Sequence, residues 1–317
     1  MRQLVLKLGL LCLVVAAVLA LLGPRIDAGR VDPFYRRFTS GPASSLIIGS
    51  SRAAQGLQPR VLAPALLGRG RYQGPMLNFA FTITNSPYGP AYLAQIKKKV
   101  AAHTRNGVFL LAVDPWVLSC DSTERQDQRL REDKSFMSKL HAAALNPNIE
   151  YILRFGDRPL YQLFAVPPLK NYDIYLHADG WLEMTVPLDS ASVQERTSRG
   201  MRRYRSFVNH WQLSDVRMQA LRQTITFLQQ HGQVYLLRLP AGVGMKQMEQ
   251  QHWPDFDSLM QRQAEAFRVP YLSYMALSAA YPTTDGNHLQ SEAGRRLSRK
   301  IAADILKLNG AHMARQK

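Results

Sequence analysis

Five short runs of mostly apolar residues constrain the fold of this chain more than any other feature. They occupy residues 45–48, 76–81, 108–113, 234–239 and 269–272. Runs of this length without polar alternation are typical of strands that are buried on both faces of a parallel sheet. Helical patterns separate several of them, for example over residues 214–232, where Ser214 is a helix cap and Gly232 a helix end. The sequence therefore predicts an α/β fold with a parallel sheet.

The segment 119–211 interrupts this alternation. It contains a polar, charged run at 121–134 and a helical patch at 149–155, and then two strand-like stretches at 172–176 and 181–184. Asp179-Gly180 lies between these stretches and predicts the turn of a hairpin. We interpret 119–211 as an inserted cap region near the ends of the core strands, where insertions tend to shape a ligand site. The core is then expected in two parts, 44–118 and 212–317.

The N-terminus carries an apolar run over residues 4–22, in which Lys7 is the one charge. Nineteen residues are about the length that crosses a bilayer as a helix. We therefore expect a transmembrane anchor over 1–25, followed by a juxtamembrane linker over 26–43. A cleaved signal peptide is the alternative, because a basic start before an apolar run is typical of it too.

The chain is strongly basic, with 40 Lys and Arg against 23 Asp and Glu, a net charge of +17. The excess persists without residues 1–30, which hold four basic residues and one acidic residue. Such a body next to a membrane suits anionic lipids or an anionic glycan, although a solubilising surface is the plainer interpretation. No zinc-finger, RNA-recognition or helix-turn-helix pattern accompanies the charge, so we expect no nucleic-acid partner.

Metal and nucleotide chemistry find no support in the sequence. The two cysteines, Cys12 and Cys120, are too few for a disulfide scaffold or a cysteine-rich zinc module. The histidines have no metal-ligand spacing, and neither a P-loop nor a dinucleotide-binding glycine motif is present. We therefore expect no metal and no cofactor.

Two short motifs at opposite ends of the chain carry the chemistry of acyl transfer. Gly49-Ser50-Ser51-Arg52 follows the first apolar run, and Asp285-Gly286-Asn287-His288 precedes a helical pattern near the C-terminus. Acyl transfer needs a hydroxyl nucleophile, an imidazole that takes its proton, and a group that fixes the imidazole tautomer. These motifs predict Ser51 as nucleophile, with Ser50 as the alternative, His288 as base and Asp285 as its partner.

In these motifs the sequence resembles the SGNH (GDSL-like) hydrolase superfamily over roughly residues 44–116 and 212–308. Its Gly-Ser-Ser variant is similar to the membrane-anchored branch, which includes D-alanine transfer proteins and alginate-type O-acetyltransferases. The resemblance implies a flavodoxin-like, three-layer fold and a Ser-His-Asp enzyme. Such an enzyme would be an esterase or O-acyltransferase that acts on an ester of a cell-envelope carbohydrate. The resemblance also implies a bacterial inner-membrane protein with one span, its soluble domain in the periplasm or outside the cell, and a membrane partner that supplies the acyl group.

The resemblance further implies where oxyanion donors should lie. Besides the backbone N–H of Ser51, Ala80 in Asn78-Phe79-Ala80 takes the place of the family's glycine. Asn78 is expected to face the substrate there, and Asn85 is another side-chain donor. The family's Gly-x-Asn-Asp block is replaced by Val113-Asp114-Pro115-Trp116, which leaves Asp114 near the site or as a strand-end cap. Arg52 could pair with a carboxylate or phosphate of the substrate, or lie on a helix surface.

Two departures from the family pattern support a different function. The acid of Gly-Asp-Ser and the Gly-x-Asn-Asp block are both missing. A catalytically degenerate SGNH fold that acts as a binding or scaffold component of a polymer-modifying complex is therefore the alternative. A run of arginines at 196–205 is interpreted either as a docking patch for a polyanion or membrane, or as a solvated loop.

Overall fold

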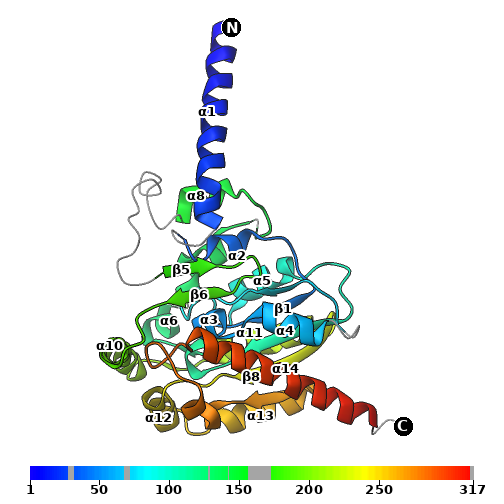
Figure 1. Ribbon diagram of the computed structural model, residues 1–317, viewed down its shortest axis with the longest axis vertical. Coiled ribbons are helices and arrows are strands. Elements are labelled where there is room, and N and C mark those ends of the chain that lie inside the picture. Colours follow the sequence, from blue (N-terminus) through cyan, green and yellow to red (C-terminus); the bar gives the residue numbers. More distant parts are fainter. Residues whose placement is uncertain (28–31, 68–71, 128, 142, 156–172, 315–317) are drawn as a thin grey trace.

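A five-stranded sheet forms the centre of the molecule. The computed structural model describes residues 1–27, 32–67, 72–127, 129–141, 143–155 and 173–314 (Figure 1). The strand order is β2-β1-β3-β8-β9, and every pair of neighbours is parallel. The strands are β1 (Ser45–Ile48), β2 (Met76–Asn78), β3 (Gly107–Ala112), β8 (Gly232–Arg238) and β9 (Tyr271–Ser273). Each expected apolar run contains or overlaps one of them, and the predicted α/β fold with a parallel sheet is confirmed.

The order of the strands creates a crevice beside β1. The chain passes from β1 outward to β2 and then returns across β1 to β3, as in flavodoxin-like doubly wound sheets. The connections after β1 and β3 therefore leave toward opposite faces of the sheet. In open α/β sheets, ligands bind outside the carboxyl ends of the strands at such a switch point. The residues after Ile48 and Ala112 lie at this position.

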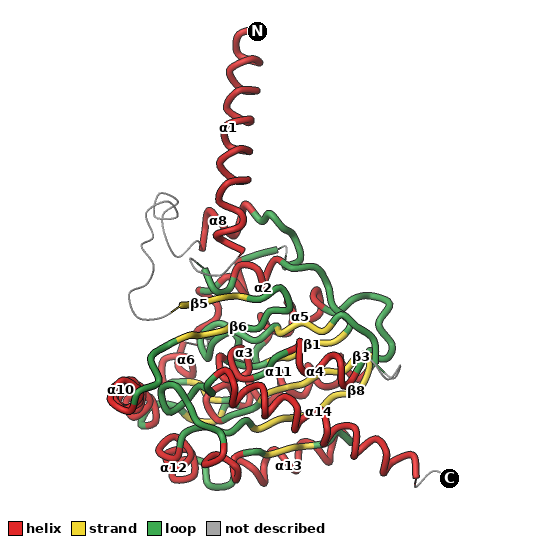
Figure 2. Tube along the Cα trace, in the orientation of Figure 1, coloured by secondary structure: helices red, strands yellow, loops and turns green. Residues whose placement is uncertain are grey.

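Helices cover both faces of the sheet. Successive strand residues point to opposite sides, so that Leu46 and Ile48 join one core and Ile47 joins the other. The first core is completed by α5 (Pro90–Lys99), α11 (Asp215–Gln229), α12 (Val243–His252) and α13 (Phe256–Phe267). The second is completed by α3 (Ser51–Gly56), α4 (Pro59–Leu66) and α14 (Ser291–Ala314). The end of α14 extends away from the body (Figure 2).

The expected insertion is folded into short elements and one long helix. Its regular elements are β4 (Ser119–Cys120), α6 (Ser122–Asp127), η2 (Arg131–Lys134), α7 (Phe136–Lys139), α8 (Ile149–Phe155), β5 (Asp173–Leu176), β6 (Leu182–Thr185) and α10 (Ser190–Val208). The predicted hairpin is confirmed, since β5 and β6 pair in antiparallel fashion, and Gly180 in the turn has φ 81°. Tyr172, at its expected start, and the rest of 156–172 lie outside the described residues.

A buried ion cluster fastens the insertion to the core. The guanidinium of Arg217 on α11 lies 2.6 Å from a carboxylate oxygen of Glu124 and 2.5 Å from one of Glu132. All three side chains are buried. In addition, β4 pairs with β7 (Gln212–Leu213), where the chain returns to the core. The insertion is thus held at the end of β3, beyond η1 (Pro115–Val117).

The N-terminal region differs in part from its expected organisation. Residues 32–43 belong to the expected linker, but they include α2 (Tyr35–Thr39), whose Tyr35 and Phe38 are buried in the first core. These two rings lie three residues apart and so share one face of the helix. Residues 28–31 of the linker lie outside the described part.

The helix α1 (Arg2–Asp27) projects from the body (Figure 1). Its apolar side chains from Leu4 to Val18 are exposed. Across the described residues, no helix has both the length and the apolar character that a membrane crossing requires, so the span expected over 1–25 is unsupported.

Candidate active site

Ser51 lies where the chain turns sharply from β1 into α3. Gly49 has φ 149°, and a Cβ atom there would lie 2.8 Å from the Cβ of Ala112 on the neighbouring strand. Glycine is required because the turn needs both a left-handed φ and this close approach. Ser50 caps α3, and Ser51 is the first residue of the helix. The hydroxyl of Ser51 is therefore presented, half-buried, at the crevice beside the carboxyl end of β1.

Asp285 and His288 lie in a tight loop before α14. One carboxylate oxygen of Asp285 accepts the backbone N–H groups of Asn287, at 3.0 Å, and of His288, at 2.8 Å. An aspartate that bonds to its own backbone in this way forms a turn locally, which explains why the short motif was visible in the sequence. Gly286, with φ 80°, supplies the left-handed residue of the loop.

The structure brings the three residues into one hydrogen-bonded chain. The Oγ atom of Ser51 lies 2.8 Å from Nε2 of His288. The other ring nitrogen, Nδ1, lies 2.7 Å from the second carboxylate oxygen of Asp285. This arrangement can pass a proton from the hydroxyl to the imidazole while the carboxylate holds the ring.

The electrostatics of Asp285 suit an orienting role. Burial raises the pKa of this carboxyl, but the charge of His288 and hydrogen bonds from His288 and Asn287 lower it more, so that the pKa falls to about 2. Asp285 is therefore ionised at neutral pH and accepts the proton on Nδ1. The lone pair on Nε2 then faces Ser51.

Ser50 is engaged elsewhere. Its hydroxyl is buried, donates to a carboxylate oxygen of Asp114 at 3.3 Å, and accepts the backbone N–H of Arg52 at 3.4 Å. Of the two candidate nucleophiles, Ser51 is the one that reaches His288.

Asp114 is placed as a cap at the end of β3. Its other oxygen accepts the backbone N–H of Val117 and caps η1. Burial raises the pKa of the Asp114 carboxyl against the opposing charge of Arg52. The cap interpretation of Asp114 thus matches its contacts, which run to Ser50 and the backbone.

The oxyanion donors expected around Asn78 and Ala80 are already used within the protein. The N–H of Ala80 donates to the side-chain oxygen of Asn78 at 3.1 Å. The amide nitrogen of Asn78 donates to the carbonyl oxygens of Ala53 and Leu57, both at 2.9 Å. Asn78 is fully buried, and it ties the end of β2 to the helix that carries Ser51. It therefore supports the nucleophile helix and does not face a substrate.

Ser51 itself supplies a backbone donor at the site. Because it is the first residue of α3, its N–H has no acceptor within the helix, and no hydrogen bond between described residues uses it. Asn85, the other expected donor, bonds through its backbone N–H to Thr82. No hydrogen bond in the described part of the chain joins Asn85 to Ser51 or His288.

Arg52 points into the protein instead of toward a substrate. One guanidinium nitrogen lies 2.6 Å from a carboxylate oxygen of Glu249 on α12, and its Nε donates to the side-chain oxygen of Asn287 at 2.8 Å. Arg52 is only 4% exposed. Sequence reasoning missed Glu249, which no local pattern marks, and it noted Asn287 only as part of its motif.

The insertion reaches the catalytic loop through α10. Arg196 on this helix donates from Nε to the carbonyl oxygen of Thr284 at 2.9 Å, and Thr197 packs so closely that a Cβ on Gly286 would lie 2.8 Å from its methyl group. The hydroxyl of Tyr204 accepts from the side-chain nitrogen of Asn287 at 3.2 Å. The arginine run is thus a helix, and part of it packs on the loop that holds Asp285 and His288.

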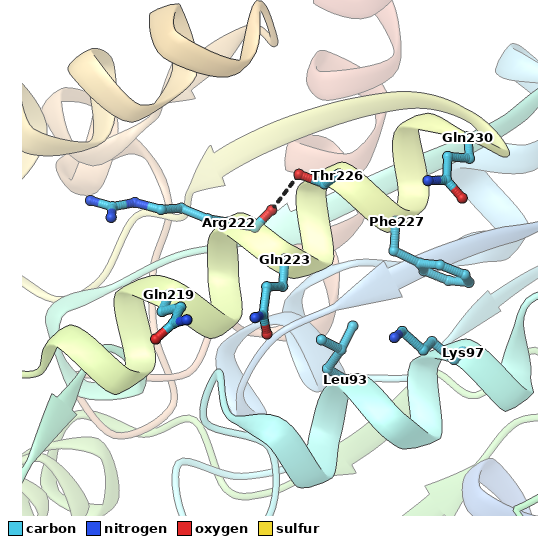
Figure 3. Close-up of a pocket in the computed structure, with 8 residues that line it drawn as sticks. All are labelled: Leu93, Lys97, Gln219, Arg222, Gln223, Thr226, Phe227 and Gln230. Atoms are coloured by element: carbon cyan, nitrogen blue, oxygen red, sulfur yellow. Dashed lines mark hydrogen bonds between the residues drawn. The ribbon is translucent and has the colours of Figure 1, made fainter.

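Among the described residues, no group of three His, Cys, Asp or Glu side chains gathers as metal ligands. A groove of about 540 Å³ lies between α5 and α11 (Figure 3). Its lining combines polar side chains such as Lys97 and Arg222 with the apolar Leu93 and Phe227, and it includes none of the candidate catalytic residues. It is therefore not where Ser51 would meet a substrate.

Comparisons with known proteins found a similar solved structure but no matching family. No family model matches the chain, and no curated protein matches it. Among solved structures, the chain is similar to the lipase/acylhydrolase from Enterococcus faecalis, with 12% sequence identity and a TM-score of 0.36. That likeness covers 82% of this chain and 93% of the other.

Proposed function

We propose that the protein is a serine-dependent ester hydrolase or O-acyltransferase of the SGNH type. The observation that carries the proposal is the chain of hydrogen bonds from Ser51 through His288 to Asp285, at the switch point of a flavodoxin-like sheet. Hydroxyl, imidazole and carboxylate in this order activate a weak nucleophile at neutral pH.

The reaction proceeds in two halves. Nε2 of His288 takes the Ser51 proton while Oγ attacks the acyl carbonyl carbon, and the carbonyl oxygen becomes an oxyanion. As the tetrahedral intermediate collapses, the ester bond breaks, and the leaving alcohol takes the proton from Nε2. The acyl-enzyme is then attacked by a second hydroxyl, whose proton passes to Nε2 and on to the Oγ of Ser51. Asp285 stays ionised throughout and stabilises the imidazolium.

The N–H of Ser51 is the donor best placed for the oxyanion. It lies on the nucleophile residue itself, and no hydrogen bond among the residues that the structure describes uses it. One donor of this kind is worth roughly 10²–10³ in kcat in serine hydrolases.

The acceptor, the substrate and the location are further parts of the proposal. Water as second hydroxyl gives an esterase, and a sugar hydroxyl gives an O-acyltransferase. The basic composition and the resemblance of the motifs support an envelope carbohydrate, anionic or acylated, with an acyl donor supplied by a membrane partner. Attachment to a bacterial inner membrane through residues 4–22, with the body on the periplasmic or outer side, rests on the sequence alone. Protease accessibility of the body in intact spheroplasts tests it.

Hydrolysis of short aryl esters tests the activity. The purified protein should release the phenol from an aryl acetate, and Ser51→Ala should abolish the release. Ser50→Ala is the matched control, because it removes the neighbouring hydroxyl that contacts Asp114, and it should retain most of the activity. Equal rates in the Ser51→Ala variant and the unaltered protein would refute the proposal.

A non-catalytic binding or scaffold role is the second candidate. The pairing of the Ala80 N–H with Asn78 favours it, because this pairing removes a donor that the SGNH mechanism would use. A folded, unaltered protein with no ester turnover and no Ser51-dependent reaction would establish it over the enzyme.

A further inference from the structure

We propose that Arg52 is a positioning residue, which acts through Asn287 to hold the acceptor nitrogen of His288 toward Ser51. The kinetic part of this inference rests on the proposed function. The inference rests on two contacts of Asn287. Its side-chain amide bonds to the buried guanidinium of Arg52 on one side and lies next to Nε2 of His288 on the other.

The hydrogen bond from Arg52 fixes the orientation of the side-chain amide of Asn287. The guanidinium has only N–H donors, so the atom of Asn287 that faces Nε of Arg52, at 2.8 Å, must be the amide oxygen. The NH₂ group must then face the other side. There it lies 3.2 Å from the hydroxyl of Tyr204 and 3.3 Å from Nε2 of His288. An amide that could otherwise rotate by half a turn is thus held in one orientation.

The fixed amide affects the base directly. The hydroxyl of Ser51 and the NH₂ of Asn287 both face Nε2 of His288, at 2.8 and 3.3 Å. The NH₂ of Asn287 can only donate, so its interaction requires Nε2 without a proton, and that is the state in which Nε2 can accept the proton of Ser51. Asp285 holds the opposite side of the ring at Nδ1. The imidazole is therefore held at both nitrogens in the tautomer that the proposed reaction needs.

Arg52 is in turn held in place by the carboxylate of Glu249. Glu249, which is fully buried, accepts from Arg52 at 2.6 Å, from the Trp116 indole at 2.8 Å and from Arg238 at 3.1 Å. Arg238 binds the same carboxylate and also pairs with Asp257, and no hydrogen bond among the described residues joins it to Asn287. Arg238→Lys is therefore a matched control for Arg52→Lys. Each change keeps the charge next to Glu249, and each replaces a forked donor by a single ammonium.

Nitrogen NMR of histidine-labelled protein tests the inference without requiring turnover. The Nε2 resonance of His288, identified by its loss in His288→Gln, should have the shift of an unprotonated acceptor. It should move in Arg52→Lys and in Asn287→Leu, and it should stay in place in Arg238→Lys. An unchanged resonance in the first two variants would overturn the inference, whether or not the protein turns over an ester.

Kinetics on an aryl ester add a double-mutant cycle. Arg52→Lys and Asn287→Leu should each lower kcat between about tenfold and a hundredfold, with KM within about twofold, because a misdirected base affects the chemical step. Since Arg52 acts through Asn287, the double variant should be no slower than the slower single variant. Multiplied losses would show that Arg52 acts independently of Asn287, and they would overturn the inference. Absence of Ser51-dependent turnover in the unaltered protein would refute the proposed function, and the NMR result would still decide the inference.

Discussion

The Nε2 atom of His288 lies 2.8 Å from the Oγ atom of Ser51, although 237 positions separate the two residues in the chain. Each residue is fixed by its own local geometry. Ser51 begins the helix after β1, and His288 closes a turn that the carboxylate of Asp285 holds together. Since α14 packs on α3 and α4, the loop before α14 lies next to the end of β1, and the two local motifs meet there.

Replacement of Asp285 by Asn should remove the group that fixes the histidine tautomer. The amide presents either an oxygen or an NH₂ to Nδ1, and the NH₂ would favour the tautomer that has its proton on Nε2. We expect kcat to fall roughly 10³–10⁴-fold, as in other serine triads with this change. Steady-state kinetics on an aryl ester measure it, and circular dichroism controls for folding. A loss of less than tenfold would argue against the orienting role.

The low pKa of Asp285 predicts a specific pH dependence of stability. Burial alone would raise the pKa, but the contacts with His288 and Asn287 bring it from 3.8 to about 2. A carboxyl with a depressed pKa in the folded state stabilises the fold above its unfolded pKa, and the contribution is lost as pH falls through the folded value. We expect about 2 kcal/mol of unfolding free energy to be lost between about pH 4 and pH 2.

Urea unfolding of the unaltered protein and of Asp285→Asn over this range measures that loss. The difference between the two proteins should narrow as the pH falls, because the amide does not titrate. A difference that stays constant from neutral to acid pH would show that the contacts of Asp285 do not lower its pKa.

Asn78→Ala should destabilise the fold and weaken the support of α3. The change removes the side-chain partner of the Leu57 carbonyl and of the Ala80 N–H, and it takes one of two donors from the carbonyl of Ala53, which still accepts the N–H of Leu57. We expect the loss of these hydrogen bonds to lower the free energy of unfolding by roughly 2–4 kcal/mol. Urea unfolding measures the loss. Asn85→Ala is the control for stability, because the structure ties Asn85 through its backbone, and it should change the free energy by less than about 0.5 kcal/mol. Similar losses in both variants would contradict the role given to Asn78.

Arg217→Ala should be among the most destabilising single changes. It leaves Glu124 and Glu132 as buried carboxylates without the guanidinium that bonds to both. Removal of one partner from a buried ion pair costs about 3–5 kcal/mol. Thermal unfolding measures the effect, and Arg199→Ala is a control because the ion pair of Arg199 with Glu195 is exposed. That control should cost less than about 1 kcal/mol. Comparable shifts in melting temperature for the two variants would refute this prediction.

The features that the sequence predicted are those with a local cause. A strand buried on both faces must be apolar throughout, so β1 and β3 were visible as runs. Asp285-Gly286-Asn287-His288 was visible because its turn is built from its own side chain and a glycine. The hairpin turn at Asp179-Gly180 was visible for the same reason.

The features that the sequence did not predict depend on distant partners. Asn78 was expected to face a substrate, but the carbonyl groups of α3, more than 20 residues away in the chain, take its amide. Arg52 was expected on a surface or at a substrate, but Glu249, 197 positions later, holds it inside. No local pattern shows either partner.

The long helix α10 is a different case, because the sequence contains the signals of a helix there. Asp189 caps it, with its carboxylate accepting the N–H of Ser192. The less exposed positions Val193, Thr197, Met201 and Tyr204 follow at helical spacing. The dense run of arginines also indicates a charged surface segment, and on that basis the segment was interpreted as a docking patch or a loop and not as a helix.

The most direct test of the proposed catalytic site is the position at which a fluorophosphonate reacts. Mass spectrometry of peptides from the labelled protein should find the adduct on Ser51, because the hydroxyl next to His288 is the activated one. The adduct should persist in Ser50→Ala and disappear in His288→Ala. An adduct on Ser50, or equal labelling of Ser51 in the presence and absence of His288, would contradict the account.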